Sequence, residues 1–447
     1  MLDDLSGRVV APGDADYDAE REVFYGGIDR RPAAIAKVAD ADDVARVIAH
    51  ARESGLELAV RSGGHSGAGY GVTDGGIVLD VGELRELAID RATQSAWAGA
   101  GLTAGEYTSA AAEHGLATGF GDSGSVGISG ITLSGGVGFL VRKHGLTIDS
   151  LLGAEIVTAA GELLRVDADS HPELFWAIRG GGGNFGVATR LHYRLHDVDR
   201  VVGGILILPA TPEVVAGFVA AADEAPEELS GIANVMAAPP VPFVPAEHHG
   251  RLVVFAMLAY AGDVDAGERA LDAFRGLATP VADMLAPIPF PEMYPPEPED
   301  QRPIAVARTG FAEDVDLDTA RTIVREVERS TAPMAVVQLR VLGGAMARVP
   351  AGATAFAHRD RRILVNVAAI YERPEERALH DEWVRLLSAE VTGGDPAGYA
   401  GFLTDEGEER IRAAYPGATW DRLAAVKARY DPDNLYRLNQ NIPPARS

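Results

Sequence analysis

The stretch Arg61–Gly71 reads RSGGHSGAGYG and combines several glycines with a single histidine. The residues immediately before it, Leu56–Val60, are apolar and predict a short strand. Glycines let a chain turn sharply and approach a ligand closely, and the N–H groups of such a turn can converge on one anion. His65 would then project from a rigid loop beside a bound ligand. Taken alone, the string also describes a turn with a surface histidine.

Two further glycine clusters lie at Gly119–Gly138 and Gly180–Gly186. The second cluster formally matches the G-x-G-x-x-G fingerprint of dinucleotide-binding folds, which needs a strand, then glycines, then a helix. The order expected here is the reverse. A helix over Pro172–Arg179, with Ser170 as its cap, precedes the glycines, and a strand over Val187–Leu195 follows them. The pattern therefore excludes a Rossmann site.

Four blocks of the chain resemble one flavoprotein family. Arg61–Gly71 resembles the signature of the vanillyl-alcohol-oxidase-type flavoproteins, which share the p-cresol-methylhydroxylase (PCMH) type of FAD domain. Gly121–Gly138 (GDSGSVGISGITLSGGVG) and Arg179–Val187 (RGGGGNFGV) are similar to the second and third flavin-contacting loops of that family. Tyr430–Pro444 (YDPDNLYRLNQNIPP) is close to the C-terminal signature of its berberine-bridge-enzyme-like subfamily. The blocks follow the family order and extend over essentially the whole chain.

The resemblance implies an α+β protein of two domains, with a PCMH-type FAD-binding fold and an antiparallel-sheet substrate domain. Residues 1–200 would form the FAD-binding domain and residues 201–404 the substrate domain. Residues 405–447 would return to the FAD domain. The distribution of residue types agrees with this division. Glycine becomes less frequent after about residue 200, and longer strand and helix patterns replace the short motifs.

Hydrophobic periodicity predicts several individual elements. A helix is expected over Ala41–Ser54, capped by Asp40 or Asp42 and ended by Gly55. The proline-rich stretch Pro287–Pro303 is expected to be a loop. The other expected strands and helices beyond residue 200 are Leu252–Ala259, Ala335–Leu342, Ile363–Tyr371, Val264–Gly276, Leu317–Ser330 and Glu375–Glu390.

The resemblance also implies the cofactor. In the family, a histidine at the position of His65 carries FAD through its 8α-methyl group, so one covalent link is expected here. A second link through cysteine, found in many relatives in the loop matching Gly121–Gly130, is impossible because the chain contains no cysteine. The residues expected to contact FAD are Arg61, Ser62, Gly63, Gly64, His65, Ser66, Gly121, Asp122, Gly124, Ser125, Gly127, Ile128, Gly130, Gly135, Gly136, Gly183, Asn184, Phe185, Gly186, Val187, Tyr436, Asn439 and Asn441.

The proton acceptor departs from the family pattern. Relatives often carry Tyr-x-Asn-Tyr before the C-terminal signature, with the second tyrosine as base, but this chain reads YAGF at 399–402. Phe402 cannot accept a proton, so Tyr399 and Asp405 are the nearby substitutes, unless Tyr399 is an interface aromatic whose hydroxyl is already satisfied. Strand alternation places Gln338 and Arg340 on one face and Asn366 on a face of its own strand. These side chains line the pocket if the faces look at the flavin, and are ordinary exposed residues if the faces look at solvent.

Charge limits the partners. The 447 residues include 40 Lys and Arg against 65 Asp and Glu, a formal charge of −25. Such a surface repels nucleic acid and anionic lipid and favours neutral or cationic substrates. No leader with basic and apolar regions and no long apolar run is visible, so a cytoplasmic protein is expected. We also expect a monomer or homodimer without a metal site.

These observations together predict an FAD-dependent oxidase. It would transfer hydride from a small or medium organic substrate to the flavin N5 and pass the electrons to O2, giving H2O2. The substrate would be a specialised-metabolite alcohol or phenol, or an amine, and the missing tyrosine favours an amine, whose oxidation needs only the neutral form. Two alternatives stay open: a dehydrogenase of the same fold with another electron acceptor, and a flavoprotein that binds or sequesters a metabolite.

Overall fold

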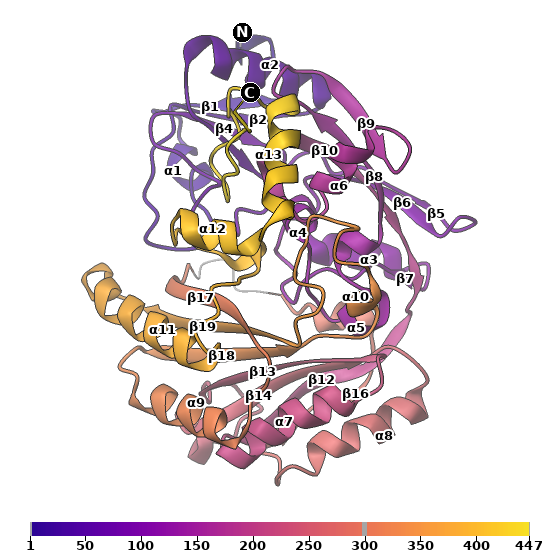
Figure 1. Ribbon diagram of the computed structural model, residues 1–447, viewed down its shortest axis with the longest axis vertical. Coiled ribbons are helices and arrows are strands. Elements are labelled where there is room, and N and C mark those ends of the chain that lie inside the picture. Colours follow the sequence, from indigo (N-terminus) through magenta and orange to yellow (C-terminus); the bar gives the residue numbers. More distant parts are fainter. Residues whose placement is uncertain (1, 297–301, 447) are drawn as a thin grey trace.

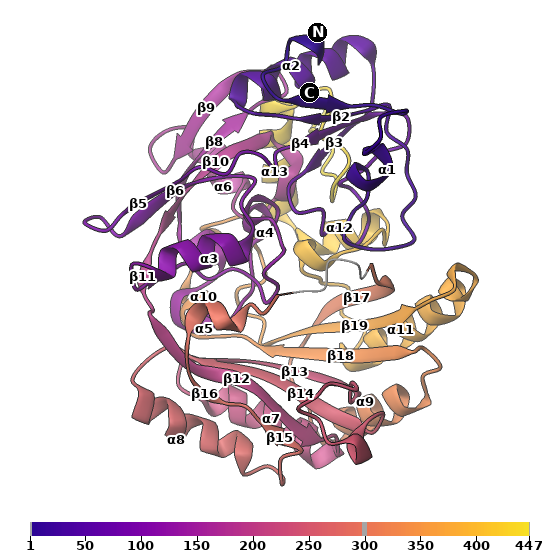
Figure 2. The same cartoon turned by 180° about the vertical axis from the view of Figure 1, so that it is seen from behind.

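The computed structural model describes residues 2–296 and 302–446. In Figure 1 the N-terminal part of the chain and the yellow C-terminal segment occupy one end of an elongated molecule, and both termini lie there. A large sheet with helices on its outer side occupies the other end, as the reverse view in Figure 2 also shows. Within the described ranges, no helix is both long enough and apolar enough to cross a membrane.

A four-stranded sheet lies near the N-terminus, and its central strands are parallel. Its order is β1 (Arg8–Val10), β2 (Ala34–Lys37), β4 (Ile77–Asp80) and β3 (Leu58–Arg61). Helix α2 (Ala41–Ser54) has the predicted bounds. The Asp40 side chain accepts the Asp43 N–H at its start, and Gly55 ends it with a φ of 67° that glycine adopts without strain.

A five-stranded antiparallel sheet follows in the chain. Its order is β5 (Leu87–Asp90), β6 (Ser95–Gly99), β10 (Val187–Arg194), β8 (Leu151–Val157) and β9 (Leu163–Asp167). The accompanying elements are α1 (Tyr17–Glu20), α3 (Ala104–Ala112), β7 (Leu116–Ala117), α4 (Ile128–Ser134), α5 (Val141–His144), α6 (Pro172–Ala177), the 3-10 turn η3 (Gly182–Asn184) and β11 (His196–Asp197). The predicted order of helix, glycines and strand over residues 172–195 is confirmed.

The predicted cap of α6 is wrong. The helix begins after His171, which has a φ of 53° and makes no side-chain capping bond, and Pro172 is its first residue. Ser170 instead closes a turn with Asp167: its N–H donates to Oδ1 of Asp167 at 2.8 Å, and its carbonyl accepts the Asp167 N–H at 2.9 Å. An aspartate side chain that accepts backbone N–H groups two and three residues further on stabilises such a turn, and here it engages the backbone of Ser170.

The large sheet has eight antiparallel strands, in the order β15 (Ala282–Asp283), β12 (Arg200–Pro209), β14 (Leu252–Tyr260), β13 (Leu229–Ala237), β18 (Met334–Val341), β19 (Ile363–Tyr371) and β17 (Ile304–Ala312), with β16 (Ala286–Pro289) also on β12. The helices of this part are α7 (Pro212–Glu224), α8 (Val264–Arg275), α9 (Leu317–Arg329), α10 (Ala345–Arg348) and α11 (Arg377–Val391). An apolar core that includes Phe218, Phe274, Ile323 and Leu387 packs α7, α8, α9 and α11 against one face, whereas α10 packs against α5. The other face is directed toward the N-terminal part (Figure 1).

The prediction of a loop over Pro287–Pro303 is partly wrong. Its first residues form β16, which pairs with β12, and the 3-10 turn η5 (Phe290–Met293) follows. Pro287 and Pro289 are compatible with this strand because it lies at an edge, where a missing N–H breaks no interior ladder. Residues 297–301 of the predicted loop lie outside the described part of the chain.

The C-terminal segment turns back onto the N-terminal part. It contains η7 (Ala400–Phe402), α12 (Glu408–Ala414) and α13 (Ala418–Tyr430). Trp420, Leu423 and Val426 of this segment share one apolar cluster with Leu174 and Phe185. The following tail is fastened as well, because the Ile442 N–H donates to Oδ1 of Asn184 at 2.9 Å.

Candidate functional site

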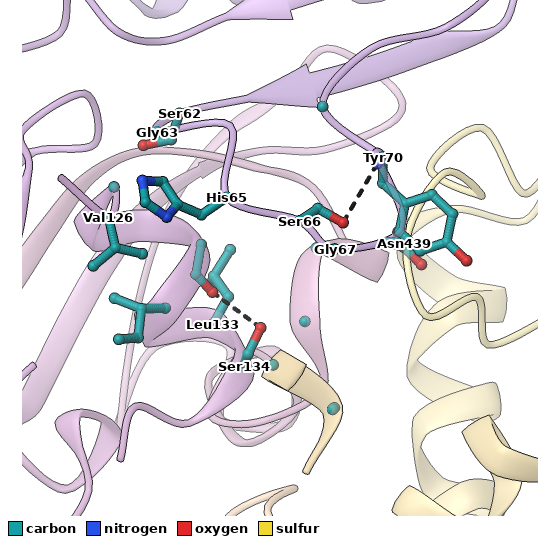
Figure 3. Close-up of a pocket in the computed structure, with 18 of the residues that line it drawn as sticks. Ser62, Gly63, His65, Ser66, Gly67, Tyr70, Val126, Leu133, Ser134 and Asn439 are labelled. Carbon is teal, nitrogen blue, oxygen red and sulfur yellow. Dashed lines mark hydrogen bonds between the residues drawn. The ribbon is translucent and has the colours of Figure 1, made fainter. Parts of the chain in front are cut away.

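A cavity of about 590 Å³ lies where the N-terminal part, the large sheet and the C-terminal segment meet. Figure 3 shows His65 turning its ring toward Val126, while Ser66, Tyr70 and Asn439 lie along another side. Most of the predicted residues line it: Arg61, Ser62, Gly63, Gly64, His65, Ser66, Gly121, Asp122, Gly127, Gly130, Gly183, Gly186, Val187, Gln338, Arg340, Asn366, Tyr399, Tyr436 and Asn439. The structure therefore brings together groups from every block that the sequence singled out.

Other predicted residues do not reach the cavity wall, and these are Gly124, Ser125, Ile128, Gly135, Gly136, Asn184, Phe185 and Asn441. Ile128 and Phe185 belong to the apolar core behind the wall. The amide of Asn184 is used within the protein, since its Nδ2 donates to the carbonyls of Gly181 and Gln440 at 2.8 and 3.0 Å. Ile128, Phe185 and Asn184 therefore support the lining from within the protein.

His65 is held by contacts on its face and at its edge. Its ring stacks on Phe24, with centroids 4.0 Å apart and an interplanar angle of 21°. Its Nε2 lies 2.9 Å from Oγ of Ser125, which lies 3.1 Å from Oγ of Ser123. The histidine loop also packs closely on the second loop, because a Cβ built at Gly63 would lie 2.3 Å from the backbone nitrogen of Gly127. Only glycine fits there, so the two loops form one rigid support.

Arg61 anchors this loop, and its guanidinium is already paired with a carboxylate of the protein. Its Nε and terminal nitrogen donate to Oδ2 of Asp80 at 2.9 and 2.6 Å, and both side chains are buried. The pair joins the end of β3 to the end of β4, which are parallel neighbours. Two charge-assisted hydrogen bonds to one carboxylate oxygen hold the guanidinium in place.

The floor of the cavity is a row of amides across the large sheet. Gln338 on β18 and Asn366 on β19 line the cavity and stand opposite one another, and Asn234 on β13 stands opposite Gln338. Nε2 of Gln338 donates to Oδ1 of Asn234 at 2.9 Å, and Oε1 of Gln338 accepts from Nε of Arg340 at 2.9 Å. Both polar atoms of Gln338 are therefore engaged. Oδ1 of Asn366 is buried, and no described residue donates to it.

Arg340 connects this floor to the second glycine-rich loop. Its guanidinium donates to Oδ2 of Asp122 at 2.8 Å and to the carbonyl of Val137 at 3.1 Å, and only 4% of the residue is exposed. It also lies 5.0 Å from the ring centroid of Phe402. Asp122 and Arg340, predicted separately as a cofactor contact and a catalytic candidate, thus form one ion pair across the cavity.

Tyr399 fits the role of a satisfied interface aromatic. Its hydroxyl accepts the N–H of Gly136 at 2.9 Å, and the residue is 2% exposed. Burial raises the pKa of this hydroxyl to about 12. A phenol of that pKa is almost fully protonated at neutral pH, so it is a weak proton acceptor.

The cavity fits an elongated cofactor with a polar chain such as FAD. Gly130 and Gly183 both line it, and a Cβ built at either position meets no atom within 4 Å. Side chains there would project into the space that the ligand needs. Oδ1 of Asn439 and Oε1 of Gln440 are buried on the lining without a hydrogen-bond partner in the described part of the chain. Buried polar atoms are normally paired, so these oxygens are available to donors of a bound molecule.

Sequence reasoning missed part of the lining. Phe24, Tyr25 and Tyr70 stand near the histidine loop, and Ala305 and Ala307 project from β17. Tyr70 lies inside the opening motif, and the alternation of small residues along β17 signals a face that approaches something closely. Phe24 and Tyr25 carry no motif, so only the folded chain brings them to His65.

Comparison with known proteins agrees with this site. Residues 32–167 match the family model described as an FAD binding domain, and residues 401–443 match the model described as berberine and berberine like. The chain is 33% identical over 465 residues to (R)-6-hydroxynicotine oxidase of Paenarthrobacter nicotinovorans, covering 99% of this chain and 98% of that protein.

Solved structures agree as well. A crystal structure of 6-hydroxy-D-nicotine oxidase from Arthrobacter nicotinovorans superposes with a TM-score of 0.88 at 28% identity, covering 100% of this chain and 99% of that one. BBE-like 1 of Physcomitrella patens, at 22% identity, shares the fold with a TM-score of 0.88 and the same coverage. The chain is therefore an FAD-linked oxidoreductase that belongs to the vanillyl-alcohol-oxidase/PCMH-type oxidases, in their berberine-bridge-enzyme-like subfamily.

Proposed function

We propose that the protein is an oxidase with one covalent bond to FAD, formed by His65, and that it oxidises a small or medium organic molecule with O2 as acceptor. The observation that carries this proposal is the position of His65. Its ring lies on the wall of the 590 Å³ cavity, on a loop that packs against the second glycine-rich loop and opposite the amide row of the large sheet. A flavin tethered there would have a substrate space bounded by Gln338, Arg340 and Asn366.

When bound, FAD supplies the redox chemistry by accepting a hydride and passing two electrons to O2, which becomes H2O2. The residues of the chain then have three tasks. The glycine-rich loops and the amides of Asn439 and Gln440 hold the cofactor. The sheet floor orients the substrate. The buried Arg340–Asp122 pair fixes the distance between floor and loop.

An amine is the favoured substrate class. Asp122 is the carboxylate among the described residues that line the cavity, and Arg340 already binds it. Tyr399 has a raised pKa, and Phe402 occupies the position of the usual base. Alcohol oxidation needs a group to take the hydroxyl proton, whereas a neutral amine can lose hydride directly. The hydroxynicotine oxidase named above, an oxidase of an amine-bearing compound by its name, is consistent with this choice.

The attachment is tested first by acid precipitation of the purified protein. A yellow pellet that turns colourless in His65→Ala supports covalent FAD at His65. A white pellet with a yellow supernatant would contradict the covalent bond.

The acceptor and the substrate class are tested next. Rapid reoxidation of the reduced flavin by air, with peroxide release, would exclude a dehydrogenase, and slow reoxidation would favour one. Anaerobic bleaching by amines but not by alcohols supports the amine proposal. Binding without bleaching or peroxide across a broad panel of compounds would favour a sequestering flavoprotein.

A further inference from the structure

Ser125 touches the proposed attachment residue although it does not line the cavity. Its Oγ lies 2.9 Å from Nε2 of His65, and Phe24 stacks on the face of the same ring. Both contacts, one polar and one planar, help to hold the ring. Ser123, whose Oγ is 3.1 Å from that of Ser125, does line the cavity. A chain of hydroxyls thus leads from the imidazole edge to the cavity.

We propose that Ser125 is a positioning residue for covalent FAD attachment: it fixes the tautomer of His65, and the Ser125–Ser123 pair carries away the ring proton. This inference rests on the proposed function, because it takes His65 as the attachment residue. A neutral imidazole has one protonated and one unprotonated nitrogen. When Nε2–H donates to Oγ of Ser125, the nucleophilic lone pair is on Nδ1.

The chemistry balances with O2 as the oxidant. A bond forms between Nδ1 of His65 and the 8α carbon of FAD, and one C–H bond of that methyl group breaks. The imidazole loses its own hydrogen as a proton from Nε2. The two electrons released reduce the isoalloxazine and then O2, so the two hydrogens leave as H2O2. Without an acceptor at Nε2 the alkylated ring would stay cationic, and Ser125 relieves that charge by passing the proton through Ser123 to water in the cavity.

The decisive experiment follows attachment and not turnover. Protein from flavin-starved cells is mixed with FAD in air, and covalent FAD is measured over time by acid precipitation and by the mass of the intact chain. In Ser125→Ala the attachment rate should fall at least roughly tenfold at neutral pH and recover as the pH rises, because hydroxide replaces the lost proton acceptor. Ser125→Thr keeps the hydroxyl and should restore the rate and its pH profile.

Ser150→Ala is the matched control, because Oγ of this serine also lies 2.9 Å from Nε2 of a histidine, His196, and neither residue lines the cavity. Equal rates and pH profiles in wild type and Ser125→Ala would overturn the inference while leaving covalent attachment intact. A Ser125→Ala chain that binds no FAD at all would also overturn it, since Ser125 would then serve binding. Wild-type protein without covalent FAD would instead refute the proposed attachment itself.

Discussion

Asn366 offers a hydrogen-bond acceptor that the described part of the chain leaves without a donor. Its Oδ1 is buried on the cavity floor, and no described residue donates to it, whereas the neighbouring Gln338 is paired at both polar atoms. Leaving such an acceptor unmet costs free energy, so a substrate that supplies an N–H or O–H binds more tightly. We therefore place the specificity of the floor at Asn366.

Replacing Asn366 by leucine should raise the KM of an amine substrate about tenfold, the loss expected for one buried hydrogen bond, with a smaller change in kcat. Steady-state peroxide release measures both constants. Val336→Ala, two residues before Gln338 on the same strand, serves as the control for a simple change in packing. An unchanged KM in Asn366→Leu would show that the amide faces the substrate without bonding to it.

Phe402 is the residue that distinguishes this site from relatives with a tyrosine base. Phe402→Tyr adds a hydroxyl to a ring whose centroid lies 5.0 Å from the Arg340 guanidinium, and a positive charge near a phenol favours the phenolate. The variant should gain peroxide release with primary alcohols of at least roughly tenfold, the lower part of the range for an added base, while amine turnover changes little. Phe402→Leu changes the shape of the side chain without adding a base, so it should show no such gain. If the rate of alcohol oxidation is unchanged in both variants, the added hydroxyl does not reach the substrate.

At the residue scale the sequence predicts what depends on backbone chemistry and misses what depends on long-range contacts. Asp40 and Gly55 bound α2 as expected, because capping is local. The alternation of β18 and β19 placed Gln338, Arg340 and Asn366 on shared faces but left open whether those faces were covered. In the structure these three side chains line the cavity. The pairing of Asp122 with Arg340 joins a loop to strand β18, which lies far away in the sequence, and no local pattern could predict it.

Helix α13 is fastened to the third glycine-rich loop by a buried charge pair. Nζ of Lys427 lies 2.7 Å from Oδ2 of Asp431, and both side chains are fully buried. The same ammonium donates to the carbonyls of Asn184 and Tyr436 at 2.8 and 2.9 Å, while Asp431 accepts the N–H groups of Leu435 and Tyr436. Every strong donor and acceptor of the pair is used. The ion pair therefore holds helix α13, the third glycine-rich loop and the C-terminal tail to one another.

Lys427→Met should lower the free energy of unfolding by about 3 kcal/mol, because it leaves the Asp431 carboxylate buried without its cation. Urea unfolding followed by circular dichroism measures the loss. Arg429→Met, an exposed position on the same helix, should change stability by no more than about 0.5 kcal/mol. A loss in Lys427→Met as small as that of the control would show that the carboxylate finds another partner.

The observed bounds of helices and strands agree with the predicted ones where one face of the element is buried. β19 over Ile363–Tyr371 and α9 over Leu317–Arg329 match the predicted segments closely, because their apolar periodicity is enforced by the core between sheet and helices. β16 escaped prediction because its prolines argue against a strand unless the strand is known to lie at an edge. Strand order is equally hidden, since nothing local says that β18 pairs with β13 across a hundred residues.

On the scale of the whole molecule, the four motif blocks predicted an arrangement that no single element could. We propose the division into residues 1–200, 201–404 and 405–447, which is supported by the separation of the sheets and by the return of α13 to the N-terminal part. Between these parts lies an apolar cluster that includes Phe139, Val201 and Tyr294. The predicted site forms at the same junction, so its geometry depends on how the parts are held together.

A pair of histidines lies close to that junction. His144 at the end of α5 stacks on His196 of β11, with ring centroids 3.9 Å apart and an interplanar angle of 16°. Burial lowers the pKa of His144 to about 3 and that of His196 to about 4. Both rings are therefore neutral in the folded protein at neutral pH, and Oγ of Ser150 lies 2.9 Å from Nε2 of His196.

This stack makes the fold sensitive to acid in a predictable direction. An unfolded histidine takes up a proton near pH 6.5, whereas the folded rings resist protonation down to about pH 3 and 4. Between those values the unfolded chain binds more protons, so stability falls as the pH falls from 6.5 toward 4 and is fully present above 6.5. His144→Phe keeps the stack but removes one titrating group, and should lower the midpoint of acid unfolding by roughly half a pH unit. Circular dichroism across a pH series measures it, with His114→Phe, outside the stack, as control; an unchanged or higher midpoint in His144→Phe would mean that carboxylates alone govern acid unfolding.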